Sequence, residues 1–231
     1  GSTLTRLEPG GASVPFASDV ASPGFAVHPD GPLYYVHWTG TGYRLRGDDV
    51  GLGAGRFWDL PMEASGVGTP TVMPDGSVAL PYKGPTFRML IARPDGSTST
   101  YELFSGPQQP AVTPYKAIPN GQGGYFVAYD DWGFNVNYYA ATIVTVDSNG
   151  VPQTYATVGG TQHAFNSGTW FPTGPGRSHG TLVMGPLSPG GPDVLNVTYN
   201  AVKNGQWGVG VTDLTASGGP LFRREGALDA V

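Results

Sequence analysis

The chain has 231 residues, of which 13% are charged, with 12 lysines and arginines in total and a formal net charge of −5. The basic residues are scattered rather than gathered in a stripe, which argues against a nucleic-acid partner, and no apolar run approaches the roughly 18 residues of a membrane span. Cysteine is absent, which excludes disulfides, thiolate metal sites and cysteine nucleophiles. The 37 glycines and 22 prolines accompany 5 tryptophans, 12 tyrosines and 10 phenylalanines, a composition that favours turn-rich β structure over disorder.

The N-terminal residues predict a pair of strands that belongs to an incomplete unit. Residues 3–7 and 14–16 are strand-like and flank the turn Pro9-Gly10-Gly11. They have the character of the third and fourth strands of a four-stranded unit. We expect this pair, residues 3–16, to form a partial unit of its own.

A short turn phrase then recurs along the chain. It appears as Pro29-Asp30-Gly31, Pro74-Asp75-Gly76, Pro119-Asn120-Gly121 and, more loosely, Pro172-Thr173-Gly174, so that the prolines are 45, 45 and 53 residues apart. Proline presets φ near −65°, the Asp or Asn side chain supports the turn, and glycine takes the positive φ. Strand-like runs flank each phrase, which predicts a series of hairpins.

Each repeat predicts four short strands. The first unit (22–60) has them at 25–28, 33–38, 43–46 and 56–60; the second (68–104) at 70–73, 77–82, 87–93 and 98–104; the third (113–158) at 115–118, 124–129, 139–147 and 153–158; and the fourth (168–225) at 169–172, 180–184, within a long run at 194–214, and at 220–224. No segment has a 3.6-residue apolar period over ten residues, so we expect almost no helix.

An all-β chain with repeats of about 45 residues and four strands in each resembles the β-propeller superfamily. The motif is generic, since neither the Trp-Asp ending of WD40 repeats nor the aspartate box of sialidases occurs. The resemblance implies one propeller-like domain over residues 1–231, with about four blades and a partial fifth blade from the N-terminal strands. A five-bladed ring is the nearest complete form, and a β-sandwich with regularly spaced turns is the alternative fold.

The resemblance also implies that the first strand of each blade lines a channel, and that one loop face binds ligands. That face carries the connections from second to third strands and those from blade to blade. None of the four expected innermost strands contains Asp or Glu. A glycosidase needs two carboxylates about 5–10 Å apart, so the pattern argues against a glycosidase centred in the channel, and we expect no catalytic residue and no cofactor.

Candidate ligand-binding residues therefore lie in the loops. Carboxylates, amides and aromatic rings gather in the expected second-to-third connection of the third unit, and this mixture suits sugar recognition. A blade-to-blade connection and two Pro-Tyr-Lys tripeptides add further candidates. The complete set is Asp130, Asp131, Trp132, Asn135, Asn137, His163, Trp170, Lys83 and Lys116.

Structural roles are an alternative for the same residues. Asp130 and Asp131 could cap a turn while Trp132 packs on a neighbouring blade. The lysine stems could cover aromatic surface with the ammonium in water. A calcium ion held by Asp130, Asp131 and Asn135 lacks the Asp-x-Asp-x-Asp-Gly pattern, so we expect no metal site.

Three functions remain open on this sequence. The first is a non-enzymatic module that binds a carbohydrate or cell-surface ligand, outside the cell, through the loop face. The second is a glycan-active hydrolase or lyase with Asp130, Asp131 and His163 as acid–base groups. The third is a protein–protein scaffold, a fragment of a larger surface or toxin protein. The absence of channel carboxylates favours the first, so the chain is expected not to be an enzyme.

Overall fold

The computed structural model confirms an all-β chain of antiparallel strands. The residues that it describes contain no helix, and thus none long and apolar enough to cross a membrane. The described backbone comprises residues 2–22, 24–29, 31–49, 55–104, 113–132, 139–158, 171–174, 182–186, 193–203, 206–214 and 220–227, with side chains described for 2–22, 24–29, 31–48, 55–103, 116–128 and 144–153.

The first two sheets are built from residues 2 to 104. The first contains β1 (Ser2–Leu7), β2 (Ser13–Val20), β3 (Ala26–Val27), β4 (Pro32–Trp38), β5 (Tyr43–Asp49) and β6 (Arg56–Asp59), in the order β1-β2-β4-β5-β6 with β3 also paired to β4. The second contains β7 (Gly66–Val67), β8 (Thr71–Val72), β9 (Val78–Lys83), β10 (Phe87–Ala92) and β11 (Thr98–Phe104), in the order β11-β10-β9-β7 with β8 paired to β9.

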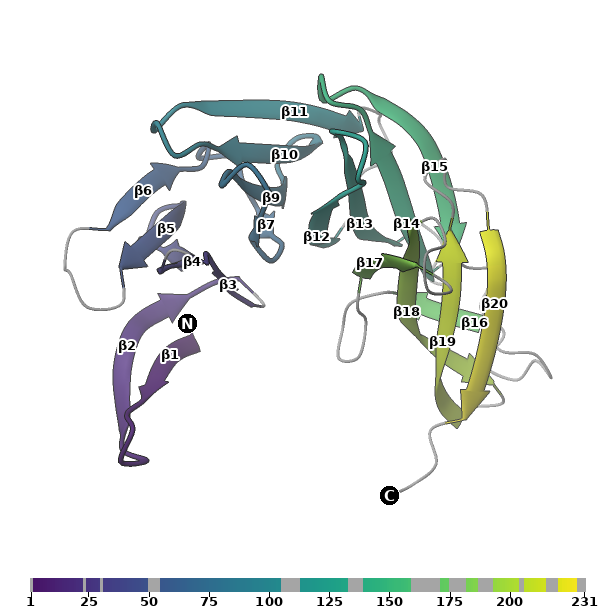
Figure 1. Ribbon diagram of the computed structural model, residues 1–231, viewed down its shortest axis with the longest axis horizontal. Coiled ribbons are helices and arrows are strands. Elements are labelled where there is room, and N and C mark those ends of the chain that lie inside the picture. Colours follow the sequence, from purple (N-terminus) through teal and green to yellow (C-terminus); the bar gives the residue numbers. More distant parts are fainter. Residues whose placement is uncertain are drawn as a thin grey trace.

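Two further sheets follow along the chain. The third contains β12 (Thr113–Pro119), β13 (Tyr125–Trp132), β14 (Tyr139–Val146) and β15 (Pro152–Val158) in sequence order. The fourth contains β16 (Phe171–Gly174), β17 (Leu182–Pro186), β18 (Asp193–Lys203), β19 (Gln206–Leu214) and β20 (Pro220–Ala227), in the order β16-β18-β19-β20 with β17 paired to β18. None of the four is closed into a barrel. Figure 1 shows them following one another along an arc.

The predicted turn chemistry is confirmed at Pro74-Asp75-Gly76. The Met73 N–H donates to Ser77 O at 2.8 Å and the Gly76 N–H donates to Met73 O at 2.9 Å, with Gly76 at φ +79°. The Asp75 carboxylate accepts the Ser77 N–H at 3.0 Å, so its side chain supports the turn as expected. The turns at 28–32 and 93–97 have the same two backbone hydrogen bonds.

The phrase Pro119-Asn120-Gly121 is a different turn from the other copies. Here the turn begins at Asn120, whose N–H donates to Gly124 O at 3.0 Å. Its Oδ1 accepts the N–H groups of Gln122 and Gly124 at 2.8 and 3.0 Å. The predicted equivalence of this phrase with the Pro-Asp-Gly copies was therefore wrong, because the Asn120 side chain organises a turn of the same length that begins two residues later in the phrase.

The second sheet is buried on both faces because it packs between its two neighbours. Alternate residues of β9 and β10 face the first sheet and pack with its core; they are Val78, Leu80, Tyr82, Leu90 and Ala92. The intervening residues belong to the core shared with the third sheet; they are Ala79, Phe87, Met89 and Ile91. Successive side chains of a strand point to opposite faces of the sheet. Because both faces of this sheet are buried, β9 and β10 are continuous apolar runs rather than alternating sequences.

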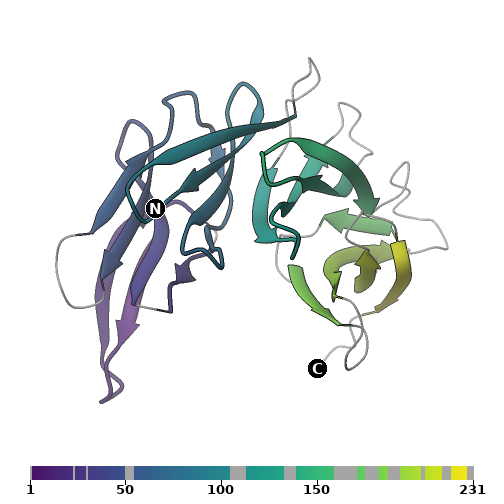
Figure 2. The same cartoon turned by 45° about the horizontal axis from the view of Figure 1, so that its top comes forward.

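The inner edges of successive sheets are in contact. Strand β3 contacts β8, β8 contacts β12, and β12 contacts β17. Thr69 and Lys116 form a parallel bridge between the second and third sheets, and a Cβ on Gly24 would lie 3.1 Å from Thr69 Cγ2. The inner edges therefore follow the concave side of the arc, where Figure 1 labels β3, β12 and β17; Figure 2 shows the same chain turned by 45°.

Interrupted inner strands are the main difference from the predicted units. In the second sheet β7 and β8 both pair with β9, and in the fourth β16 and β17 both pair with β18. The prediction that 180–184 forms a second strand was thus wrong: β17 shares the inner edge with β16. The long run at 194–214 then supplies the second and third strands as the hairpin β18–β19.

The N-terminal strands form the expected hairpin, and its turn repeats the pattern found elsewhere. The Glu8 N–H donates to Ala12 O and the Gly11 N–H donates to Glu8 O, both at 2.8 Å. The hairpin does not stand as a separate sheet, because β2 continues into the first sheet through the pair Val20↔His37.

Candidate functional site

The described structure places the first three candidate residues in a strand rather than in a loop. Asp130, Asp131 and Trp132 are the last residues of β13, paired with Ala141, Ala140 and Tyr139 of β14. The predicted second-to-third connection is thus shorter than expected, because backbone pairing continues to the Trp132↔Tyr139 position. Asn135, Asn137, His163 and Trp170 lie outside the described residues.

The two candidate lysines lie at different positions along their strands. Lys83 ends β9, paired with Phe87 and Gly66. Lys116 lies midway along β12, half-buried beside Thr69, and this burial lowers the pKa of its ammonium. The two Pro-Tyr-Lys tripeptides are therefore not equivalent in position.

An aromatic pair of one exposed and one half-buried ring lies at the second-to-third turn of the first sheet. Trp38 and Tyr43 are cross-strand partners on β4 and β5, with ring centroids 4.9 Å apart and planes at 62°. Trp38 is 40% exposed. The turn between them is closed by the Thr39 N–H and Oγ1, which donate to Gly42 O at 2.9 and 3.1 Å. We call residues 38–43 the Trp38 patch.

A charged pair lies one register position away from the Trp38 patch. The Arg44 guanidinium donates from Nε and Nη2 to the two carboxylate oxygens of Asp59, at 2.5 and 3.1 Å. This hydrogen bond raises the pKa of Arg44, and its guanidinium also lies 4.3 Å from the centre of the Phe57 ring. Both charges are thus internally matched, so the patch offers an aromatic surface beside a neutralised ion pair.

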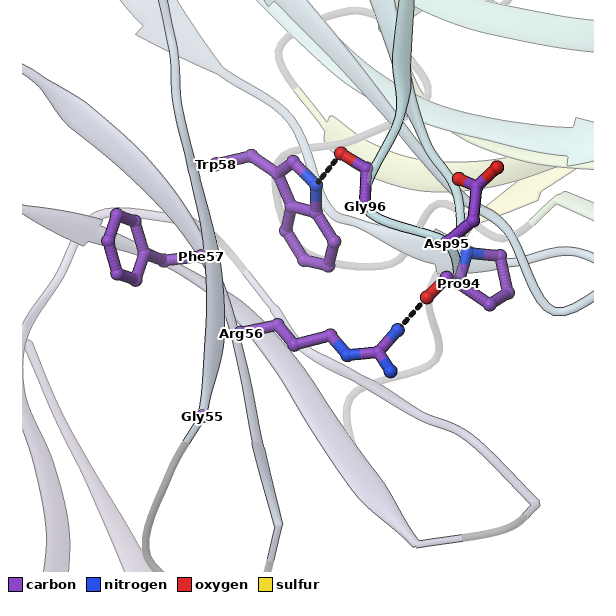
Figure 3. A pocket seen from close by; sticks show the side chains of 7 residues that line it. All are labelled: Gly55, Arg56, Phe57, Trp58, Pro94, Asp95 and Gly96. Atoms are coloured by element: carbon purple, nitrogen blue, oxygen red, sulfur yellow. Dashed lines mark hydrogen bonds between the residues drawn. The ribbon is translucent and has the colours of Figure 1, made fainter.

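The opposite end of the first sheet borders an open hollow of about 430 Å³ (Figure 3). We call it the Arg56 hollow; it is lined by Gly55, Arg56, Phe57, Trp58, Pro94, Asp95 and Gly96. The Arg56 guanidinium donates from Nη1 to Pro94 O, and the Trp58 Nε1–H donates to Gly96 O at 3.3 Å. These two hydrogen bonds join β6 to the β10–β11 turn of the next sheet.

A partly buried network lies within the first sheet. The Tyr35 hydroxyl donates to Asp48 Oδ2 at 2.5 Å, and Arg46 Nη2 donates to Asp48 Oδ1 at 3.0 Å. Burial, followed by the hydrogen bond to Asp48, raises the pKa of Tyr35 well above its usual range. The Asp48 carboxylate thus accepts from both Tyr35 and Arg46, and these hydrogen bonds join β4 to β5.

Within the described residues, no three His, Asp or Glu side chains are grouped closely enough to hold a metal ion. Several charged groups there form separate ion pairs, such as Arg88 with Glu63 at 3.2 Å.

Sequence reasoning missed Arg56 as a site residue. Arg56 and Pro94 are 38 residues apart and belong to different units, so no local motif joins them. The one local signal was the turn Pro94-Asp95-Gly96, which joins the outer strands β10 and β11 and there contacts β6 of the preceding sheet.

No family model matches the chain, and no curated protein is significantly similar to it. A solved structure of a protein of unknown function from Bacteroides caccae is similar over 93% of this chain and 85% of that one, at 14% sequence identity and a TM-score of 0.46. We draw no conclusion about function from this similarity.

Proposed function

We propose that the chain is a non-enzymatic binding module, located outside the cell, that recognises a carbohydrate through one loop face of a propeller-like domain. In this proposal the four sheets are blades, and the N-terminal hairpin is the outer half of a partial blade. The successive contacts of the inner edges, from β3 through β8 and β12 to β17, support this arrangement.

The Trp38 patch is the observation that carries the proposed function. It lies at the second-to-third turn of a sheet, on the face where the propeller resemblance puts the ligand. The Trp38 ring is 40% exposed although an apolar ring is normally buried, and the edge contact with Tyr43 holds it in one orientation.

The chemistry of the patch suits a sugar. A fixed indole face can pack on the C–H-rich side of a pyranose ring, while the Thr41 hydroxyl, 3.4 Å from that of Thr39, can exchange hydrogen bonds with sugar hydroxyls. Asp130, Asp131 and Trp132, which were predicted from the sequence, end β13. They lie where the second strand of the third sheet leads to the third strand, as Trp38 does in the first sheet. The two positions belong to the same proposed face.

A glycan array with the fluorescently labelled protein tests the proposal, with heat-denatured protein as the control. We expect a coherent set of related glycans to bind, and Trp38→Ala to weaken that binding about tenfold while the circular dichroism spectrum is unchanged. Phe25→Ala is the matched control, because Phe25 is 53% exposed and adjoins β3, whose partners Leu33 and Tyr34 lie at the far end of β4.

Two further variants locate the site on the face. Trp132→Ala and Asp130→Ala test the residues selected from the sequence. Loss of binding in these variants with full binding in Trp38→Ala would move the site to the third sheet. An array without hits from folded protein would overturn the carbohydrate function and favour a protein scaffold.

A further inference from the structure

In the Arg56 hollow, the Nε and Nη2 donors of Arg56 have no acceptor among the described residues. Arg6, Arg44, Arg46 and Arg88 each have a carboxylate oxygen within 4.0 Å. Arg56 has no such carboxylate among the residues that the structure describes, although its guanidinium lies in the wall of an open hollow (Figure 3). Arg93 also has no carboxylate oxygen within this distance among the described residues, but it does not line the hollow, so Arg56 is distinguished by the combination of the two features.

The backbone of the next sheet fixes the position of this guanidinium. Arg56 Nη1 donates to Pro94 O, which uses one end of the group and restrains the long side chain. The Nε and Nη2 hydrogens, which form the fork that Arg44 uses on Asp59, stay unassigned within the described structure. A prepositioned fork of this kind suits a planar oxyanion, because both hydrogen bonds form with little further loss of side-chain entropy.

The other walls of the hollow define what else a ligand should carry. Pro94 gives an apolar surface, and Asp95 gives a carboxylate whose pKa is lowered by hydrogen bonds from the Ser97 hydroxyl and N–H. An ionised Asp95 accepts hydrogen bonds from hydroxyl groups and repels a second negative charge. The combination therefore favours a ligand with one carboxylate and several hydroxyls over a phosphate dianion or a run of acidic residues.

We propose that the Arg56 hollow is a second ligand site, separate from the Trp38 patch, that binds an acidic sugar of the hexuronate class. The ligand carboxylate accepts from Nε and Nη2 of Arg56, and ring hydroxyls donate to Asp95. This proposal rests on the proposed carbohydrate function and names the chemical class. The two sites lie at opposite ends of the first sheet, since Arg56 pairs with Gly47 while Trp38 pairs with Tyr43.

NMR titration of the ¹⁵N-labelled protein tests this site with sodium D-glucuronate as the probe. We expect saturable shifts of the Gly55 and Gly96 amides, which line the hollow. D-glucose and sodium acetate at the same concentrations and ionic strength are the controls. Glucuronate should bind at least about tenfold more tightly than either, because only glucuronate engages both Arg56 and Asp95.

Three variants separate the fork from simple charge. Arg56→Gln should abolish saturable glucuronate binding, and Arg56→Lys should weaken it roughly tenfold, because lysine keeps the charge but lacks the paired donors. Arg6→Gln is the matched control: it removes an arginine whose Nε and Nη2 already donate to Glu8 and which does not line the hollow, and it should leave binding unchanged. An unchanged spectrum outside the hollow verifies the fold of each variant.

Distinct outcomes overturn distinct claims. Equal binding of acetate and glucuronate, stronger binding of a tetraglutamate peptide, or glucuronate binding that survives Arg56→Gln would each overturn the hexuronate site. Glycan-array binding that depends on Trp38 would still support the proposed function in those cases. Glucuronate binding lost in Arg56→Gln, with no glycan binding sensitive to Trp38, would instead support the hollow and reject the loop-face site.

Discussion

The Tyr101 ring, on the outer strand of the second sheet, lies directly against Gly150 in the β14–β15 turn of the third. A Cβ on Gly150 would overlap the Tyr101 ring atoms. The preceding pair of sheets repeats this relationship, because the Trp58 indole on β6 donates to Gly96 O in the β10–β11 turn. An aromatic side chain of one outer strand thus contacts the turn glycine of the next sheet in both places.

This contact predicts a large effect of Gly150→Ala on stability. Gly150 has φ +82°, which an L-residue adopts at a cost of about 1–2 kcal/mol, and the added methyl group must also displace Tyr101. We expect the free energy of unfolding to fall by about 2–4 kcal/mol, measured by urea denaturation.

Gly96→Ala is the matched control for this prediction. Gly96 has φ +90°, but a methyl group added to its Cα would have no atom within 4 Å, so we expect a loss of about 1 kcal/mol from the backbone conformation alone. Equal losses in the two variants would contradict a role for the Tyr101 contact.

Ser22 is predicted to stabilise the interruption between β2 and β3. Its hydroxyl accepts the Val36 N–H at 3.1 Å and donates to Gly24 O at 2.6 Å, and the residue is buried. Ser22→Ala leaves both backbone groups without this partner, and we expect a loss of about 1–3 kcal/mol by urea denaturation. Exposed Ser18→Ala should change stability by less than about 0.5 kcal/mol. Similar small changes in both variants would show that the Ser22 bridge is dispensable.

Tyr35 should make stability depend on pH in the alkaline range. The pKa of Tyr35 is raised in the folded state by burial and by its hydrogen bond to Asp48. The neutral phenol therefore stabilises the fold fully below the unfolded-state pKa near 10, and this contribution decreases as the pH rises above that value. Tyr35→Phe should cost about 2 kcal/mol at pH 7 and less at about pH 11. Urea denaturation of both proteins at several pH values measures the difference, and a difference that stays constant with pH would contradict the assignment.

Lys116 should lower stability at neutral pH. Burial lowers the pKa of its ammonium, so the charged form is disfavoured in the folded state and this penalty is relieved as the pH rises toward the usual lysine pKa. We expect Lys116→Met to raise the thermal midpoint at neutral pH, and the gain to shrink by about pH 10. Lys83→Met, which removes the same charge at the end of β9, controls for the change in net charge. A lower midpoint in Lys116→Met would indicate that the ammonium has a stabilising partner.

The turns and strands of the first two units were predictable because their signals are local. Proline, aspartate and glycine in Pro74-Asp75-Gly76 determine a turn through their own φ values and a side-chain hydrogen bond, whatever the rest of the fold does. The apolar runs of β9 and β10 likewise indicate strands buried on both faces. The comparison of repeats failed at Asn120, because Pro-Asn-Gly and Pro-Asp-Gly look alike in sequence but their turns begin at different positions in the phrase.

The all-β class, the hairpin turns and most strand positions thus follow from local patterns of residues. Three features do not: β17 shares an inner edge with β16, Asp130–Trp132 continue a strand, and Arg56 donates to Pro94 O. These features depend on backbone pairing and on packing between residues tens of positions apart. These contacts stabilise the fold only when whole sheets come together, so no short stretch of sequence predicts them.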